Sequence, residues 1–320
     1  MCIIIYSWDG KVGINWGVWH KKIIIRKVPH FRYFQQFWAK LFYQIWLLRD
    51  NPDNIILNFL YHGEDSLPKK FVYFNVLHSP VSQIPKRYEY IKEKLKSFKN
   101  IHFIAVSRFV KKQATPFIGN NQITVIHNGV DTDYFTYKPI VSNNTLRLIT
   151  LSALEERKGI HYVINALAEL GDNSIKYDVY GDGPFEKNLK EMVYSLNLGK
   201  NITIHPSSNL AKEILQDSHV YCLLSKGEAF PLGPLEAMSC GLPVLVSDYP
   251  PYDEFVNDDI GIKVSIDSLD SIINAIDRLK DIDLRRKMGF NGRKLVKEKF
   301  SWGIVAEKYF NFTSENIKRI

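Results

Sequence analysis

The sequence contains only three cysteines, Cys2, Cys222 and Cys240. An odd number without a framework spacing argues against a disulfide-stapled scaffold and is typical of free thiols in a reducing compartment. Long apolar runs are also missing, since no window reaches the roughly 18 uninterrupted apolar residues of a membrane span. The N-terminal stretch lacks the basic start and the apolar length of a signal peptide. We therefore expect a cytoplasmic protein.

Metal-ligand spacing is absent as well, because histidines, cysteines and carboxylates do not cluster in the chain, so no metal site is predicted. Charge is unevenly shared along the sequence. Residues 1–140 hold 20 Lys and Arg against 9 Asp and Glu, net +11, whereas residues 141–320 hold 22 against 25, net −3. A basic front half and a mildly acidic back half predict two domains with different partners.

Short apolar runs alternate with amphipathic segments along the whole chain. Strands are expected at residues 3–6, 23–28, 55–59, 70–77, 101–106, 123–126, 146–151, 175–180, 202–204, 220–224, 242–246 and 260–264. Helices are expected at 31–49, 88–98, 109–115, from 160, from about 185 to 196, at 234–240 and within 268–299. This alternation predicts an α/β protein built on doubly wound parallel sheets. The polar stretch 136–145 is the expected hinge.

The most informative stretch is residues 220–248, a buried strand, a loop, a short helix and a second buried strand. Pro234 is expected at the first helical position, and Gly241 is expected to end the helix in a left-handed conformation. In an open α/β sheet, the loop between strand and helix lies at the carboxyl end of the strands, where ligands bind. The sequence therefore places a ligand site in this unit.

Two glutamates belong to that unit, Glu228 on the loop and Glu236 in the expected first turn of the helix. Free N–H groups around Gly233 to Leu235 are expected to form an anion-binding site. The carboxylates beside it can accept hydrogen bonds from hydroxyl groups, so the unit suits a ligand with both phosphates and sugars. Alternatively, Glu236 only complements the helix dipole and Glu228 is a solvated loop charge.

The stretch reads E-A-F-P-L-G-P-L-E-A-M-S-C-G-L-P-V and resembles the signature E-G-F-P-L-x-x-L-E-A-M-A-x-G-x-P-V of family 4 retaining glycosyltransferases of the GT-B fold. By that resemblance, Glu228 contacts hydroxyls of the donor sugar and Glu236 contacts the ribose of the nucleotide. The residues expected to present backbone to the diphosphate are Phe230, Pro231, Leu232 and Gly233. Ala229 departs from the family glycine, which implies a stiffer loop.

The segment H-N-G-V-D-T-D-Y-F at residues 127–135 resembles the family's transition from first to second domain, and the resemblance places Gly129 near the donor. Asp131 and Asp133 also fit the metal-binding D-x-D of the other main glycosyltransferase fold. We reject that interpretation, because the surrounding sequence matches the linker of the GT-B family.

A lysine beside a helix N-terminus can stabilise a diphosphate leaving group, and Lys158 lies in S-A-L-E-E-R-K-G-I. The family usually has G-R-L-x-x-x-K-G there, so Ala153 stands at the arginine position and Arg157 is the candidate substitute. Lys158 can otherwise be an ordinary surface residue at a helix start. In G-D-G-P, Gly181 and Gly183 resemble a family turn that approaches the ligand.

His78 in V-L-H-S-P resembles the first-domain histidine that approaches the transferred sugar, although a lone loop histidine is more often incidental. The first helix of the family is not evident here, so the first domain is expected to be reduced. The resemblance thus implies two Rossmann-type domains facing a cleft, residues 1–137 rejoined by a C-terminal helix from about 301 to 320, and residues 138–300.

The function implied by the resemblance is retaining, metal-independent transfer from a UDP-sugar or GDP-sugar to a glycan or lipid-linked acceptor. In that view the second domain binds the donor, and Glu228, His78 and Lys158 are the catalytic candidates. No further cofactor and no nucleic acid is expected. The basic first domain fits an anionic surface at the inner face of the membrane. A non-catalytic partner with the same fold and a sugar-nucleotide epimerase are the alternatives.

Overall fold

A computed structural model describes residues 3–7, 23–27, 54–57, 72–94, 101–119, 122–139 and 145–317 of the chain. The chain divides into two compact units, one formed by residues 1–127 with 306–320 and the other by residues 128–305. The sequence-based boundary at residue 137 lies later than this division. None of the helices among the described residues is long and apolar enough to cross a membrane.

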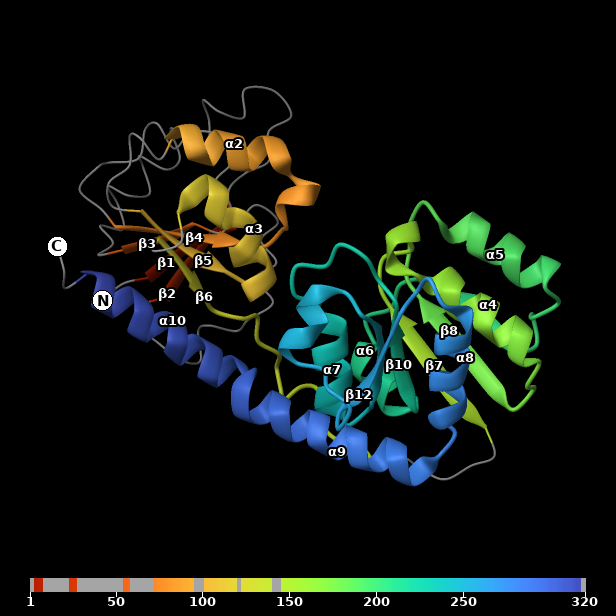
Figure 1. Ribbon diagram of the computed structural model, residues 1–320. Helices are drawn as coiled ribbons and strands as arrows, with labels where there is room; N and C mark the ends of the chain where they lie inside the picture. Colours follow the sequence, from red (N-terminus) through yellow and green to blue (C-terminus); the bar gives the residue numbers. More distant parts are fainter. Residues whose placement is uncertain are drawn as a thin grey trace. The chain divides into compact units, whose positions relative to one another are not determined.

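The first unit is built on a parallel sheet with strand order β2-β1-β3-β4-β5-β6 (Figure 1). Its strands are β1 (Ile3–Ser7), β2 (Ile23–Lys27), β3 (Asn54–Leu57), β4 (Tyr73–Leu77), β5 (Ile101–Ala105) and β6 (Ile123–Val125). Its described helices are η3 (Val81–Gln83), α2 (Pro85–Lys94), α3 (Arg108–Ile118) and most of α10 (Trp302–Ile317). Phe312 of α10 packs against Phe74 and His102, so this last helix covers one face of the sheet.

The second unit contains a parallel sheet with strand order β12-β11-β10-β7-β8-β9. Its strands are β7 (Leu146–Leu151), β8 (Ile175–Tyr180), β9 (Ile202–His205), β10 (Val220–Leu223), β11 (Val244–Ser247) and β12 (Gly261–Val264). The chain runs outward from β7 to β9 and then returns to β10 on the other side of β7. The order therefore reverses between β7 and β10, which is the topological switch point where open α/β sheets bind ligands.

Helices cover both faces of this second sheet. They are η5 (Glu156–Lys158), α4 (Ile160–Leu170), α5 (Glu186–Ser195), α6 (Ala211–Gln216), α7 (Leu232–Cys240), η6 (Pro250–Glu254), α8 (Leu269–Arg278) and α9 (Ile282–Lys299). Figure 1 shows α4, α5 and α8 on one face, and α6, α7 and α9 on the other. The predicted α/β class with doubly wound parallel sheets is confirmed.

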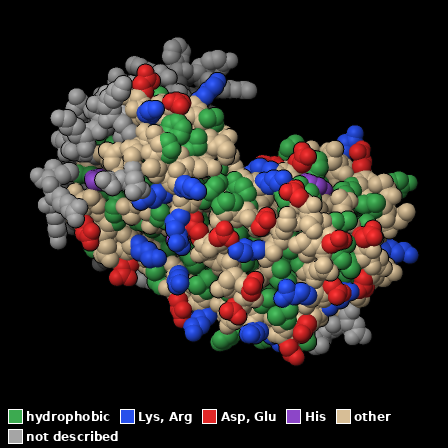
Figure 2. Space-filling view, viewed as in Figure 1, with side chains coloured by type: hydrophobic (Ala, Val, Ile, Leu, Met, Phe, Trp, Pro, Cys, Tyr) green, Lys and Arg blue, Asp and Glu red, His purple; other side chains and the backbone are tan. Residues whose placement is uncertain are grey.

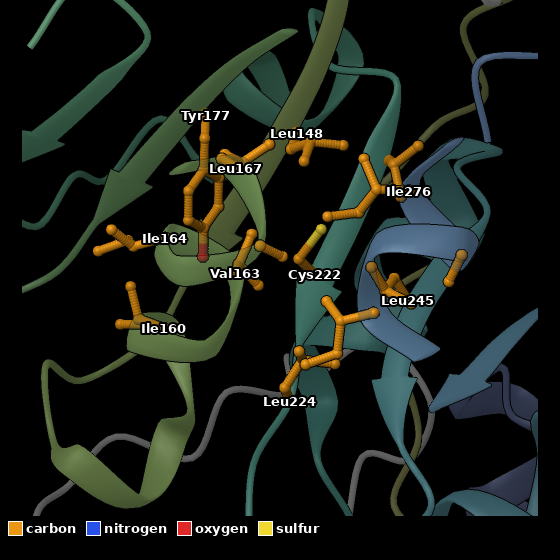
Figure 3. Close-up of a cluster of buried hydrophobic side chains, with 14 of the residues drawn as sticks. Leu148, Ile160, Val163, Ile164, Leu167, Tyr177, Cys222, Leu224, Leu245 and Ile276 are labelled. Atoms are coloured by element: carbon orange, nitrogen blue, oxygen red, sulfur yellow. The ribbon is translucent and has the colours of Figure 1, made fainter. Parts of the chain in front are cut away.

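Apolar side chains of α4, α8 and the central strands form the core of the second unit (Figure 3). The face of α4 predicted from residue spacing is buried there, with Ile160, Val163, Ile164 and Leu167 pointing toward the sheet. Cys222 lies in the same core. Burial raises the pKa of its thiol, as it does for Cys240, and both are free thiols as expected. These cysteines are therefore packing residues.

One local expectation needs correction, and one helix was not predicted. Helix α7 begins at Leu232, with Pro231 in an extended conformation as the preceding cap residue, so Pro234 is the third helical residue and not the first. A proline is tolerated there because the first N–H groups of a helix have no intrahelical partner. The short helix α6 was not anticipated. The helix expected at 31–49 and the reduction of the first domain concern segments outside the described residues.

Candidate functional site

The loops that follow β7 and β10 meet at the topological switch point of the second unit. The Nζ of Lys158 lies 2.6 Å from Oε1 of Glu228, and both side chains are largely buried, with 13% and 12% of their surface exposed. The Nη1 of Arg157 lies 3.3 Å from the same carboxylate oxygen, while its Nε lies 2.6 Å from Oε2 of Glu155. Three of the predicted site residues are therefore brought together around one carboxylate.

Glycine makes this approach of the two loops possible. Gly159 ends η5 in the left-handed conformation with φ of 70°, and a Cβ there would lie 2.0 Å from the carbonyl oxygen of Leu224 at the end of β10. The backbone N–H of Lys226 donates to the carbonyl of Arg157 at 2.8 Å. Lys158 thus supplies a positive charge, and Gly159 allows the loop after β7 to pack against the loop after β10.

Glu236 lies beyond the first turn of α7, as its fifth residue, which corrects the predicted place near the helix start. Burial raises the pKa of its carboxyl group. Tyr221 of β10 is influenced electrostatically by both glutamates. Its pKa is raised first by burial and then by the negative charges of Glu236 and Glu228. Both carboxylates therefore lie close enough to this one phenol to act on it electrostatically.

The start of α7 has fewer free backbone N–H groups than the sequence predicted. Pro231 and Pro234 have no N–H, and Leu235 follows Pro231 by four residues, so its N–H is in place for the regular helical hydrogen bond. The unpaired donors of the first turn are those of Leu232 and Gly233. Gly233 is required for packing, since a Cβ there would lie 2.2 Å from the hydroxyl oxygen of Tyr221. The N–H groups available to an anion are thus those of Leu232 and Gly233, closer to the loop than the predicted Gly233 to Leu235.

The remaining loop residues divide between core and surface. The ring of Phe230 is 4% exposed and packs against Phe255 and Phe300, so only its backbone can meet a ligand. Pro231 is buried, while Leu232 is exposed. Ala229 imposes no strain, because Asn197 is the only non-glycine residue of the described ranges with positive φ. The left-handed position of this loop falls on Gly227, with φ of 84°.

Three other glycines predicted near the ligand are explained by packing. A Cβ on Gly181 would lie 1.9 Å from the carbonyl oxygen of Ser152, and one on Gly183 would lie 2.4 Å from that of Leu154. The turn after β8 therefore packs closely against the loop after β7. A Cβ on Gly129 would lie 2.7 Å from the ring of Trp302. Contact of these glycines with a ligand stays a prediction.

His78 follows β4 in the first unit, apart in the sequence from the residues above. Burial, and next the positive charge of Arg87, lower the pKa of its imidazole to about 4. The ring is therefore neutral near pH 7, a state in which one nitrogen can accept a hydrogen bond and the other can donate one. Its catalytic role stays a prediction.

The first aspartate of D-x-D, Asp131, has a structural role. Oδ1 of Asp131 accepts hydrogen bonds from the backbone N–H groups of Asp133 and Tyr134, at 3.1 and 2.8 Å. This turn accounts for Asp131 without a metal. Within the part of the chain that the structure describes, no group of three or more histidine, cysteine or acidic side chains could hold a metal ion.

Sequence reasoning missed Tyr221 and Asn128. In the sequence, Tyr221 is one more residue of an apolar strand. The one signal for its role was Gly233, because a glycine at the start of a helix indicates that a large side chain packs closely against it. Asn128 was passed over for its neighbour Gly129. The amide Nδ2 of Asn128 donates to the carbonyl oxygen of Phe230 at 3.2 Å, so the segment 128–130 directly contacts the loop that carries Glu228.

Comparison with known proteins agrees with the motif. The sequence model of the family "Glycosyl transferases group 1" matches residues 138–295. The chain is 25% identical over 238 residues to an uncharacterized glycosyltransferase, MJ1607, of Methanocaldococcus jannaschii, covering 68% of this chain and 61% of that protein. It is 28% identical over 216 residues to the MMP alpha-(1->4)-mannosyltransferase of Mycolicibacterium hassiacum, covering 63% and 51%. The chain thus spans about half the length of the curated relatives it matches.

Solved structures share the fold along nearly the whole chain. Anabaena Alr3699/HepE in complex with UDP-glucose superposes with a TM-score of 0.82 at 16% identity, covering 98% of this chain and 100% of that one. The sucrose-phosphate synthase of Thermosynechococcus elongatus superposes with a TM-score of 0.78 at 16% identity, covering 100% of both chains. At such identities the likeness establishes the GT-B fold.

Proposed function

Residues 138–295 belong to the glycosyl transferases group 1, and from that premise we propose that the chain transfers a sugar from a UDP-sugar or GDP-sugar to a glycan or lipid-linked acceptor. We further propose that the transfer retains the anomeric configuration and needs no metal. The observation that carries the proposal is the pairing of Lys158 with Glu228 at the switch point, on the loop that leads into α7 and its residue Glu236.

Each of these groups matches one part of a sugar nucleotide. Sugar and ribose hydroxyls donate hydrogen bonds, so the carboxylates of Glu228 and Glu236 suit them as acceptors. The diphosphate is an anion, and Lys158, Arg157 and the N–H groups of Leu232 and Gly233 suit it as donors. Because ligands of open α/β sheets bind at the switch point, the donor is expected to lie across the loops after β7 and β10.

The proposed step breaks the bond between the anomeric carbon and the diphosphate oxygen and forms one to the acceptor oxygen. The proton of the acceptor hydroxyl passes to a phosphate oxygen of the leaving group, so the step needs no further reactant. Attack from the face that the diphosphate leaves retains the configuration. Lys158 and the helix N–H groups would stabilise the charge that grows on the departing diphosphate, which is the electrostatic work a metal does elsewhere.

Two relatives support the substrate class through what their names say. One is the mannosyltransferase named above, and another is the UDP-Gal:alpha-D-GlcNAc-diphosphoundecaprenol alpha-1,3-galactosyltransferase of Escherichia coli, 28% identical over 203 residues. The second name specifies a nucleotide-sugar donor and a lipid-linked acceptor. We propose the same two classes for this chain, and a cytoplasmic location at an anionic membrane surface. Neither the non-catalytic nor the epimerase alternative has an observation in its favour.

The test combines binding and turnover. Thermal unfolding is measured with UDP, GDP and their common sugar conjugates, because a ligand stabilises the native state only if its pocket is formed. A rise in the melting temperature with one base identifies the donor. That sugar nucleotide is then incubated with candidate acceptors, with and without EDTA. Transfer that survives EDTA and retains the configuration supports the proposal.

Three results would contradict it. The absence of any nucleotide-dependent stabilisation would favour the non-catalytic alternative. Conversion of the sugar nucleotide into its epimer without an acceptor would establish the epimerase. Transfer that stops in EDTA and returns with manganese or magnesium would overturn metal independence.

A further inference from the structure

The loop between β10 and α7 is held from the side by the first and last segments of the second unit. Asn128, half-buried at the beginning of that unit, donates its side-chain N–H to the carbonyl oxygen of Phe230 at 3.2 Å. Phe300, near the other end of the unit, packs its ring 5.7 Å from the ring of Phe230. One residue of the loop therefore receives a polar contact from one segment and an apolar contact from the other.

These two segments also bind each other. The N–H of Val130 donates to the carbonyl of Phe300 at 2.8 Å, and the N–H of Trp302 donates to the carbonyl of Val130 at 3.2 Å. Between them, Gly129 lies against the ring of Trp302 so closely that no Cβ would fit. The backbone that directly follows Asn128 is thus fixed, and this restrains the position from which its amide contacts the loop.

The position of the accepted carbonyl gives this hydrogen bond its importance. Phe230 comes two residues after Glu228, and its carbonyl belongs to the peptide plane that leads into Pro231 and the start of α7. A hydrogen bond that fixes this plane fixes the direction of the chain between the carboxylate and the N–H groups of Leu232 and Gly233. Small displacements of such groups have large effects on binding and rate.

We propose that Asn128 is a positioning residue for the donor site. Resting on the proposed function, this inference assigns Asn128 the task of holding Glu228 and the first turn of α7 in the geometry that binds the diphosphate and the sugar. Asn128 itself need not touch the donor. The coupling runs from the 128–130 segment through the carbonyl of Phe230 to the loop.

The sharpest variant is Asn128→Asp, which keeps the shape of the side chain but replaces the donor with an acceptor. The carbonyl of Phe230 then loses this donor, and we expect nucleoside diphosphate to bind about tenfold more weakly. The probe is whichever of UDP and GDP binds the wild-type protein, measured by calorimetry on protein whose circular dichroism is native. The matched control is Asn291→Asp, because the amide of Asn291 donates to the carbonyl of Asp259 at 3.1 Å on another part of the unit.

A merely structural role would lower the melting temperature of both variants and leave the affinity of the folded protein unchanged. Equal affinity in wild type and Asn128→Asp would therefore overturn the inference. If wild-type protein binds neither nucleotide, the proposed function fails and the inference fails with it. These two failures are distinguished by the wild-type titration alone.

Hydrogen exchange on the wild-type protein provides a test that does not depend on the variant folding. Addition of the nucleotide should slow exchange at residues 224–233 and, together with them, at 128–130 and 300–302. Slowing that is confined to the loop would contradict the coupling. Slowing at all three segments would support it.

Discussion

The ammonium group of Lys158 and the carboxylate of Glu228 contact each other across the switch point, with 2.6 Å between Nζ and Oε1. A donor that binds there enters a site whose two central charges already neutralise each other. A bound diphosphate would have to replace Glu228 as the partner of Lys158, and sugar hydroxyls would have to replace Lys158 as the partners of Glu228. Removing either partner should therefore have different consequences for the diphosphate and for the sugar.

Glu228→Gln and Lys158→Met separate these two consequences. Glu228→Gln releases Lys158, so the affinity for the bare nucleoside diphosphate should be kept or rise. Transfer should fall tenfold or more, since a charge-assisted hydrogen bond is worth about 1.5–3 kcal/mol. Lys158→Met should weaken both. Calorimetry and a transfer assay on the same preparations check this, and loss of diphosphate affinity in Glu228→Gln would contradict the division of roles.

The raised pKa of Glu236 predicts that the affinity for the nucleotide depends on pH. Burial raises the pKa of its carboxyl group in the free protein, whereas ribose hydroxyls that donate to it favour the ionised form. Nucleotide binding should therefore release a proton from the fraction that is protonated, and affinity should strengthen as the pH rises through that raised pKa. Glu236→Gln should bind at least tenfold more weakly at neutral pH and show a flatter profile. A wild-type affinity that is independent of pH between mildly acidic and neutral conditions would argue against this role.

Arg157 and Ala153 form a double-mutant test. If Arg157 substitutes for the arginine that the resemblance places at residue 153, Arg157→Ala should weaken diphosphate binding about tenfold. Ala153→Arg should have little effect while Arg157 is present, whereas in the double variant it should recover most of the loss. Additive effects would mean that the two positions do not serve the same phosphate.

Gly233→Ala tests the close contact under α7. The new methyl group would meet the hydroxyl of Tyr221, so the free energy of unfolding should fall by about 1–3 kcal/mol. Tyr221→Phe removes the hydroxyl and should recover part of the loss, although it also removes the hydrogen bond to the carbonyl of Leu151. Urea unfolding of the single and double variants measures the coupling. Equal losses with and without the hydroxyl would place the strain elsewhere.

The basic first half predicts binding to an anionic leaflet. Each basic residue near such a surface contributes about 1 kcal/mol, and the described part of the first unit exposes Lys86, Lys92, Arg108 and Lys112, among others. The second unit shows acidic and basic side chains intermingled on the face in Figure 2. We expect co-sedimentation with anionic vesicles at low salt, its loss at high salt, and none with neutral vesicles. Equal binding to both vesicle types would favour a soluble acceptor.

The sequence was sufficient for the second sheet because its strands are short and lie between turn residues, and they are either largely apolar, as β10 and β11 are, or alternate apolar with polar residues, as β8 does. The predicted bounds of β7 and β8 agree with the structure to the residue. Glycine and proline were informative but less specific. Gly241 ends α7 with φ of 88° as expected, while Pro234 occupies the third helical position instead of the predicted first.

The site was harder to predict because its geometry depends on contacts between distant segments. The K-G and E-x-x-x-x-x-x-x-E patterns identified Lys158, Glu228 and Glu236. They did not reveal that Arg157 meets Glu228 or that Asn128 meets Phe230, since these pairs are 71 and 102 residues apart. Tyr221 was not predicted for a related reason. The alternation of side chains along a strand predicts which face of the sheet a residue lies on, but not which residues it contacts there.

The contact between Trp302 and Gly129 has a spectroscopic consequence. The sequence has six tryptophans, and Trp302 is the only one within residues 128–305. Its indole lies on a segment that packs beside the loop between β10 and α7, and tryptophan emission depends on local packing and polarity. Exchanging the other five for phenylalanine would leave Trp302 as the single tryptophan of the chain. The arrival of a nucleotide would then be visible as a change in emission, without any attached dye.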